Sequence, residues 1–397
     1  MVTVDGPPDP ALTRRLSSSD CLVICSEPSL HQPAGPDRGW LWVGRGWGPG
    51  PDQSQVDTWG PVRLAKLLSR LIFDPAWKPQ SPWDRPLEGM VEIVRACKLK
   101  CPLCPVGNGE AKHYPNMTVE VFSRIAAALA PTVWKLSLYN YGEPLLHPHL
   151  GRLIRIAKDE GLERVEIVTN GNVMRPGLAR EMVLSGLDFL RFSIDGATQA
   201  TYAQYRAGGD LGRVWSNLRA VRQARQTLDA ENPTLEAQFI VTRINEHQIE
   251  DFKKAASANG ADQVRLKTFN VHMSGAKFAQ QGRTFLPQDM SLSRYRDYGQ
   301  LTLGDAFKLS RCRWPWDRVV VNADGTVVPC CYDYNGRHPL GSFTSEGSHW
   351  WQTEARRAFG RRLKEDPLSI EMCARCPVGV PDLSVKEDGV METKRAD

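Results

Sequence analysis

The sequence contains no run of about 18 consecutive apolar residues, so no segment qualifies as a membrane-spanning helix. Residues 1–20 also lack the positive charges followed by an apolar stretch that mark a secretion signal. There is no internal repeat and no long low-complexity tract. These absences predict a cytoplasmic protein without a membrane partner. In that reducing compartment the ten cysteines are expected to be ligands or core residues rather than disulfides.

A strong charge of either sign is missing as well. The 50 Lys and Arg residues stand against 45 Asp and Glu residues, and the basic ones are dispersed apart from short clusters such as 356–362. Because nucleic-acid binding usually needs a basic stripe or patch, we expect no nucleic-acid partner. Hydrophobic residues at 41% and charged residues at 24% are typical of a soluble globular chain. The length of 397 residues allows two or three domains, at roughly 150 residues each.

Residues 1–87 differ in composition from the rest. They hold six of the twelve tryptophans and are rich in Gly and Pro, which predicts an irregular N-terminal extension of unknown role. Its tryptophans are expected to pack over the rest of the chain, with the gripping of a peptide as the alternative. Cys21 and Cys25 lie among apolar residues and are expected in a buried strand.

From about residue 88 onward, strand and helix patterns alternate. Strands are expected at 90–96, 133–141, 164–170, 189–195, 235–242 and 263–269, and helices at 118–130, 150–161, 177–186, 212–228 and 248–260. Thr118 is a candidate N-cap, and Gly161, Gly186 and Gly260 are candidate C-caps. Six such units predict a curved parallel sheet or a partial barrel, with chemistry on the loops that follow the strands.

After about residue 300 the alternation stops. A β-hairpin is expected over 318–330, turning at 323–325, and a helix over 348–366. A Cys-x2-Cys pair, Cys373 and Cys376, follows that helix and is a candidate for metal binding.

Three cysteines, Cys97, Cys101 and Cys104, follow the first expected strand closely. Spacing alone would allow a helical core stripe, but the prolines and lysines among and after the thiols favour a loop. Thiolates are the ligands of iron–sulfur clusters, and three of them leave one iron of a cubane open for a reacting group. Zinc with His113 as a fourth ligand is the rival interpretation.

This Cys-x3-Cys-x2-Cys loop resembles that of the radical S-adenosylmethionine (SAM) superfamily, and the resemblance covers about 88–384. It implies a partial (β/α)6 TIM-like barrel over 88–300. It also implies that Cys97, Cys101 and Cys104 bind a [4Fe–4S] cluster whose open iron is chelated by SAM.

Two further segments carry the same resemblance. Residues 140–148 are similar to the family's Gly-Gly-Glu-Pro signature, with Tyr141 in place of the first Gly, so that Gly142 and Glu143 would bind the SAM amino group. The segments 168–172 and 192–206 resemble the SAM ribose and carboxylate motifs. They imply Ser193 and Arg206 as SAM-binding residues, with Asn170 and Asp195 as weaker candidates.

The C-terminal cysteines are similar in layout to the SPASM and twitch extensions, which bind auxiliary iron–sulfur clusters. The full SPASM form needs cysteines after the Cys-x2-Cys pair, and none follows Cys376. The resemblance therefore implies a small cysteine-rich domain over 301–384, followed by a polar tail at 385–397. One auxiliary [4Fe–4S] cluster would be bound by Cys312, Cys330, Cys373 and Cys376. Cys331 is left over, and an all-cysteine zinc site is the alternative.

The resemblance implies reductive cleavage of SAM to a 5′-deoxyadenosyl radical, which abstracts hydrogen from a substrate C–H bond. An electron donor such as flavodoxin or ferredoxin would supply the electron. The expected reaction is oxidation of a sugar-like or aminocyclitol alcohol with the auxiliary cluster as electron acceptor. Maturation of a ribosomally made peptide is the alternative, and a non-catalytic iron–sulfur or zinc protein is the alternative from another class. No catalytic base is identified.

Overall fold

The computed structural model describes residues 86–271, 276–303, 312, 314–344, 351, 353–374, 376, 383–385 and 391–393. All of them belong to the second of two units of the chain, Arg85–Asp397. The six N-terminal tryptophans, Cys21 and Cys25 therefore lie outside the described residues. Within the described ranges, no helix is long and apolar enough to cross a membrane.

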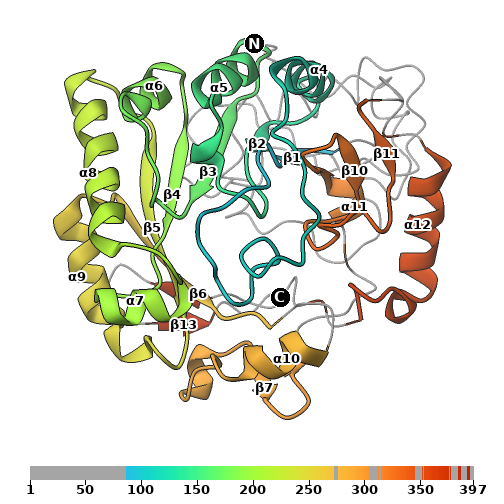
Figure 1. The fold of residues 1–397 in the computed structure, drawn as a ribbon. Helices are drawn as coiled ribbons and strands as arrows, with labels where there is room; N and C mark the ends of the chain where they lie inside the picture. Colours follow the sequence, from blue (N-terminus) through green and yellow to red (C-terminus); the bar gives the residue numbers. More distant parts are fainter. Residues whose placement is uncertain are drawn as a thin grey trace, which may run out of the picture. The chain divides into compact units, whose positions relative to one another are not determined.

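Six parallel strands follow one another across the sheet in chain order. They are β1 (Glu88–Val91), β2 (Lys135–Ser137), β3 (Arg164–Thr169), β4 (Phe189–Ser193), β5 (Thr234–Val241) and β6 (Gln263–Thr268). The crossovers contain α4 (Val119–Leu129), α5 (Leu150–Asp159), α6 (Leu178–Leu184), α7 (Gln199–Tyr205), α8 (Leu211–Thr227) and α9 (Ile249–Asn259). Figure 1 shows these helices outside a curved row of strands. The expected partial (β/α)6 barrel is confirmed.

The helices begin where local chemistry predicts. The Thr118 hydroxyl accepts a hydrogen bond from the Val121 backbone N–H at 3.2 Å and caps α4. Gly260 ends α9 with φ of +86°, a left-handed conformation that favours glycine. Helix α7 was not expected from the sequence. It is short and polar, and Thr198 caps it by accepting from the Thr201 N–H.

The first two strands are shorter than expected. β1 ends at Val91 instead of reaching residue 96, because Glu92 and Arg95 turn their buried side chains toward segments outside the ladder. β2 covers 135–137 rather than 133–141, and after it the chain turns to bring Gly142 against the backbone that follows β1. The loops that carry the candidate site therefore start closer to the sheet than the sequence indicates.

The expected C-terminal hairpin is present and extends the barrel sheet. β9 (Arg318–Val321) lies parallel to β1, β10 (Thr326–Val328) pairs with β9, and β11 (Gly341–Ser342) forms the sheet edge. The turn closes with a hydrogen bond from the Gly325 N–H to the Asn322 carbonyl at 2.9 Å. One hydrophobic cluster runs from the barrel strands into the hairpin and Phe359. The hairpin therefore shares the barrel core.

The remaining elements lie around this sheet. They are α10 (Ala276–Arg283), β7 (Tyr295–Asp297), β8 (Thr302–Leu303), α11 (Trp314–Asp317), α12 (Glu354–Glu365), β12 (Leu383–Val385) and β13 (Met391–Thr393), with short 3-10 turns at Pro144–Leu146, Glu246–Gln248, Met290–Leu292 and Pro367–Ser369. Helix α12 begins later than the expected residue 348, because Thr353 caps it at Arg356 N. β13 pairs with β12, so part of the expected polar tail forms a strand.

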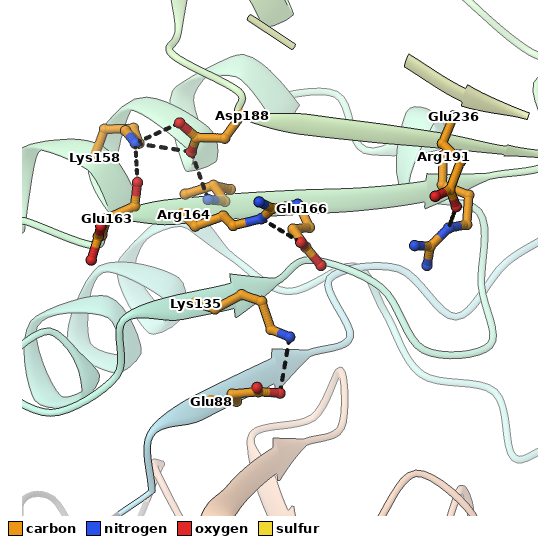
Figure 2. A network of polar contacts seen from close by, with 10 residues as sticks. Glu88, Lys135, Lys158, Glu163, Arg164, Glu166, Asp188, Arg191 and Glu236 are labelled. Atoms are coloured by element: carbon orange, nitrogen blue, oxygen red, sulfur yellow. Dashed lines mark hydrogen bonds and ion pairs between the residues drawn. The ribbon is translucent and has the colours of Figure 1, made fainter. Parts of the chain in front are cut away.

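Ion pairs join neighbouring strands across the sheet (Figure 2). Glu88 and Lys135 are register partners on β1 and β2, and their side chains meet at 3.0 Å. Arg191 and Glu236 are register partners on β4 and β5 and also form an ion pair. Opposite charges on facing residues favour one register over a slipped one. The strand ends that carry the candidate site are thereby aligned with one another.

Candidate active site

The three cysteines lie in a loop after β1, as expected, and outside any helix. The Cys104 N–H donates to the Cys101 carbonyl at 3.2 Å, and the Lys100 N–H donates to the Ala207 carbonyl at 2.9 Å. Cys101 is buried, whereas Cys97 and Cys104 are partly exposed. The loop is thus fixed against the segment that follows α7.

The turn after β2 packs directly against the start of this loop. The Glu143 N–H donates to the Ala96 carbonyl at 2.9 Å. A Cβ atom added to Gly142 would lie 1.8 Å from the Val94 carbonyl oxygen, closer than any real contact. Glycine is therefore required here by close backbone approach. This position keeps Glu143 next to the cysteine loop.

The Glu143 carboxylate is 2% exposed and accepts three hydrogen bonds. Its Oε1 accepts from Thr169 Oγ1 at 2.7 Å and from the Leu145 N–H at 3.0 Å, and its Oε2 accepts from the Asn170 N–H at 2.8 Å. A carboxylate offers about four acceptor positions, so roughly one stays open. Burial raises the pKa of Glu143, against these hydrogen bonds and the charge of Arg206. A cationic ligand would restore the charged form.

Asn170 joins this carboxylate to the cysteine loop. Its backbone N–H donates to Glu143, and its side-chain Nδ2 lies 3.4 Å from Cys97 Sγ. Thr169, which also donates to Glu143, was not singled out from the sequence. The only signal for it was its place beside Asn170 in the same segment. The structure thus brings Cys97, Glu143 and Asn170 together.

Arg206 and Asp195 form a second polar group beside the loop. Arg206 Nε lies 2.6 Å from Asp195 Oδ2, and Asp195 Oδ1 accepts from the Ile240 N–H at 2.8 Å. Burial raises the pKa of Cys101, while the charge of Arg206 and a hydrogen bond from it lower that pKa. Ser193 is 5% exposed at the end of β4. Arg206 therefore pairs with a carboxylate and also acts electrostatically on a candidate cluster ligand.

The thiols of this loop suit a cationic iron–sulfur cluster. Burial raises the pKa of Cys97 to about 12, and the negative charges of Glu143, Cys101 and Cys104 add to that rise. Several buried thiolates with a carboxylate among them need a positive partner, which bound metal supplies by displacing the thiol protons. In the described residues no three His, Cys, Asp or Glu side chains surround one metal position. His113, the zinc ligand of the rival interpretation, is exposed.

The C-terminal cysteines influence one another's ionisation. Burial raises the pKa of Cys330, and the charges of Cys331, Cys376 and Cys373 raise it further. Burial raises the pKa of Cys373 to about 12, with Cys312 adding to the effect. The Cys376 N–H donates to the Cys373 carbonyl at 3.1 Å, which closes the Cys-x2-Cys turn. The four expected auxiliary ligands thus act on one another electrostatically.

Tyr141, which replaces a glycine of the family signature, is affected electrostatically by cysteines of both groups. Burial raises its pKa, and so do the charges of Cys331, Cys104 and Cys330. Its ring packs edge-on against Tyr334 at a centroid distance of 5.3 Å. The two candidate cluster sites therefore face a shared aromatic group. In the segment after the hairpin, the Asp333 carboxylate accepts hydrogen bonds from the backbone N–H groups of Arg337 and His338.

Two family models match the chain. The radical SAM superfamily model matches residues 91–256, and the SPASM iron–sulfur cluster-binding domain model matches residues 312–377. The matched ranges contain Cys97, Cys101 and Cys104 in the first case, and Cys312, Cys330, Cys373 and Cys376 in the second.

Named relatives and solved structures agree with these matches. The GTP 3′,8-cyclase of Peptoclostridium acidaminophilum is 27% identical over 190 residues, 47% of this chain and 56% of the relative. The chain spans about half the length of the first curated relatives it matches. Streptococcus suis SuiB bound to S-adenosylmethionine has a TM-score of 0.54 at 15% identity, covering 80% of this chain and 76% of SuiB. The enzyme anSMEcpe with bound AdoMet has a TM-score of 0.51 at 14% identity, covering 75% and 89%.

The cysteine loop, the Gly-Glu-Pro turn and the two matched domains occur in the expected order on the expected barrel. The cofactors implied by these domains are [4Fe–4S] clusters and SAM. The chain therefore contains a radical SAM domain over residues 91–256 and a SPASM iron–sulfur cluster-binding domain over residues 312–377.

Proposed function

We propose that this chain oxidises a small sugar-like or aminocyclitol alcohol by radical SAM chemistry. Cys97, Cys101 and Cys104 would hold the cluster that binds SAM, and Cys312, Cys330, Cys373 and Cys376 the auxiliary cluster. When bound, the first cluster and SAM supply a 5′-deoxyadenosyl radical that removes a hydrogen atom from carbon. The proposal rests on the contacts of Asn170. Its backbone N–H donates to the buried Glu143 carboxylate, and its side-chain amide lies beside Cys97 Sγ.

The residues of the chain bind and orient the reactants. Glu143 offers its remaining acceptor position to the SAM ammonium group, and Asn170 and Thr169 hold the carboxylate in place. Gly142, Ser193 and Arg206 complete the expected SAM site, with Arg206 fixed by Asp195. Because Glu143, Thr169, Asn170 and Ser193 are buried, they also keep water from a reactive intermediate.

An oxidation removes two electrons, of which hydrogen abstraction accounts for one. Cys104 of the first group and Cys330 of the second both raise the pKa of Tyr141, so both groups lie near this residue, which supports transfer of the second electron to an auxiliary cluster. The lack of cysteines after Cys376 favours a single auxiliary cluster and, with it, a small alcohol.

Peptide maturation is the second candidate function. The observation that favours it is the match to the SPASM model, together with the fold shared with SuiB, a protein also solved bound to its precursor peptide SuiA. Deuterium labelling separates the two candidates. Transfer of deuterium from a labelled aminocyclitol to 5′-deoxyadenosine would support oxidation of a small alcohol. Transfer only from a labelled peptide would support peptide maturation instead.

The cluster assignment is tested by replacing Cys97, Cys101 and Cys104 together with Ala. The reconstituted natural chain should hold about eight irons and eight sulfides, and the variant about four of each. Only the natural chain should form 5′-deoxyadenosine from SAM. A variant that keeps this activity would refute the radical mechanism, and zinc in place of iron at the first site would do so too.

A further inference from the structure

Three exposed cations surround the outer side of the cysteine loop. Lys98 and Lys100 flank Leu99 within the loop, and Arg213 lies in the first turn of α8. The hydrogen bond from the Lys100 N–H to the Ala207 carbonyl fixes the loop to the segment that leads into α8. We name Lys98, Lys100 and Arg213 the cationic face.

A surface pocket of about 470 Å³ lies within this face. Lys98 and Arg213 line it together with Asp210, Asn172 and Asn217. Asp210 is the one carboxylate in that lining, and it accepts the Arg213 N–H at 3.0 Å as the cap of α8. Two cations against one carboxylate leave the lining of the pocket positive, and Lys100 lies two positions beyond Lys98 in the same loop.

The cations of this face are also unpaired. Among the described residues neither Lys98, Lys100 nor Arg213 forms an ion pair, whereas many other surface cations do, Arg225 with Asp262 at 2.6 Å for example. Unpaired, hydrated charges add little to the stability of a fold, but they attract a partner of opposite charge and speed its encounter.

The position of the face defines what such a partner would do. Lys98 is the direct neighbour of Cys97, so a molecule docked here lies within one loop of a cluster held by that cysteine. On the basis of the proposed function, that cluster needs one electron from outside for each cleavage of SAM. Protein electron donors form small, transient interfaces in which opposite charges raise the association rate.

We propose that the cationic face is the docking surface for an acidic one-electron donor protein of the flavodoxin type. The flavin hydroquinone of the donor gives up one electron and becomes the semiquinone, and the bound [4Fe–4S] cluster is reduced from the 2+ to the 1+ state. No bond is made or broken in this step.

The test compares two charge-reversed variants of the reconstituted protein. One carries Lys98→Glu, Lys100→Glu and Arg213→Glu. The matched control carries Arg124→Glu, Arg180→Glu and Lys254→Glu, three exposed cations on α4, α6 and α9 with the same change in net charge. Stopped-flow absorbance of reduced flavodoxin follows its oxidation, and reduced methyl viologen, a small cation, serves as the chemical reductant.

The natural chain should oxidise reduced flavodoxin at a rate that falls with added salt. The face variant should be slower by roughly 10-fold or more at low salt and should lose that salt dependence, while the control variant stays within about twofold of the natural chain. Methyl viologen should reduce all three proteins equally.

Equal slowing of both variants, or of neither, would overturn the proposal. A face variant that methyl viologen also reduces slowly would overturn it as well, because the cations would then act on the cluster or SAM site itself. Since donor oxidation is measured without SAM, this outcome is independent of whether SAM is cleaved. Failure of the proposed function would appear separately, as a lack of 5′-deoxyadenosine with methyl viologen.

Discussion

Glu143 is the residue on which SAM binding should depend most directly. Glu143→Gln keeps the size of the side chain but removes its negative charge, and it turns an amide N–H₂ toward one of the three donors that now reach the carboxylate. A charge-assisted hydrogen bond is worth roughly 1.5–3 kcal/mol, so the Kd for SAM should rise by about 10- to 100-fold. Calorimetric titration of the reconstituted protein with SAM measures this.

The matched control for that prediction is Glu120→Gln, on the exposed surface of α4. It should leave the Kd for SAM unchanged. If Glu143→Gln bound SAM as tightly as the natural chain, the carboxylate would have no part in the site.

Cys97 gives a prediction for alkaline pH in the cluster-free protein. Its pKa is raised to about 12 in the fold, whereas a thiol in the unfolded chain ionises near pH 9. Above pH 9 the unfolded chain is stabilised by ionisation of the Cys97 thiol, whereas in the folded chain this thiol stays protonated. The free energy of unfolding should therefore fall by about 1.4 kcal/mol per pH unit for this group alone.

Urea unfolding of the cluster-free protein between about pH 8 and 10.5 measures that slope. In Cys97→Ala the slope should be smaller by the contribution of this one thiol, whatever constant offset the lost side chain adds. Equal slopes in the two proteins would mean that Cys97 ionises alike in the folded and unfolded chains. The holoprotein should not show the effect, because its thiols are already deprotonated by metal.

At the residue scale the sequence predicted the candidate cluster and SAM ligands, but it did not predict which distant residues lie next to them. The spacing of Cys97, Cys101 and Cys104 and the Gly-Glu-Pro triplet were sufficient to propose a SAM site. The effect of Arg206 on the pKa of Cys101 was not predictable, nor was the bridge by Asn170 from Glu143 to Cys97. Such contacts join residues tens of positions apart, and only the curvature of the sheet brings them together.

A buried ion pair, Glu92 with Arg95, connects three elements near the site. Arg95 Nε donates to Glu92 at 2.7 Å, and Arg95 also donates to the Tyr334 carbonyl in the segment after the hairpin. Glu92 accepts the Tyr141 N–H at 3.2 Å. Both side chains are almost completely buried. The pair thus connects the end of β1, the turn after β2 and the C-terminal domain.

Arg95→Met should destabilise the fold by about 3–5 kcal/mol, because it leaves the Glu92 carboxylate buried without a partner. Burial raises the pKa of Glu92, and Arg95 is the first of the groups that lower it. Without Arg95 the carboxyl group should stay protonated to higher pH in the fold. The loss should therefore be smaller at pH 5 than at pH 8. Thermal and urea unfolding at the two pH values measure it.

The double variant Glu92→Gln, Arg95→Met separates charge from packing. It should recover most of the lost stability, because the amide oxygen can still accept the Tyr141 N–H without an uncompensated charge. A double variant as unstable as Arg95→Met would assign the loss to the packing of the Arg95 guanidinium over the Tyr114 ring instead.

Element type was easier to predict than element length. The strands and helices of the barrel were expected in the right order, since their apolar periods are long and clear. β1 was expected to reach residue 96, because the apolar residues of 90–96 continue beyond the end of the ladder at Val91. α7 was missed, since its seven residues, QATYAQY, are too few to show a clear helical period.

At the scale of the whole molecule, the two matched domains share one sheet. A pattern over 318–330 predicts a hairpin, but it does not predict that β9 will pair with β1, more than 200 positions earlier in the chain. The sequence therefore suggested an appended domain beginning at residue 301, and that boundary stays a prediction. What the structure adds is that β1 has neighbours on both sides, β2 and β9.

This shared sheet predicts that the barrel does not fold without the C-terminal part. A chain ending at Leu303 would leave β1 as an open edge and would lose Val319, Val321 and Phe359 from the common core. Open apolar edges favour aggregation, and a core that loses one side loses its cooperativity. We expect the shortened chain to aggregate or to unfold without a sharp transition, as measured by size-exclusion chromatography and urea unfolding.

The informative comparison is a full-length variant with Ala at positions 312, 330, 373 and 376, which keeps β9 but lacks the auxiliary ligands. It should unfold in one cooperative transition and retain about four irons at the first site. The auxiliary cluster would then be needed for electron transfer, whereas the hairpin that carries it would be needed for the fold. A shortened chain that stays monomeric, unfolds cooperatively and binds SAM would show instead that β1 is stable with β2 as its only neighbour.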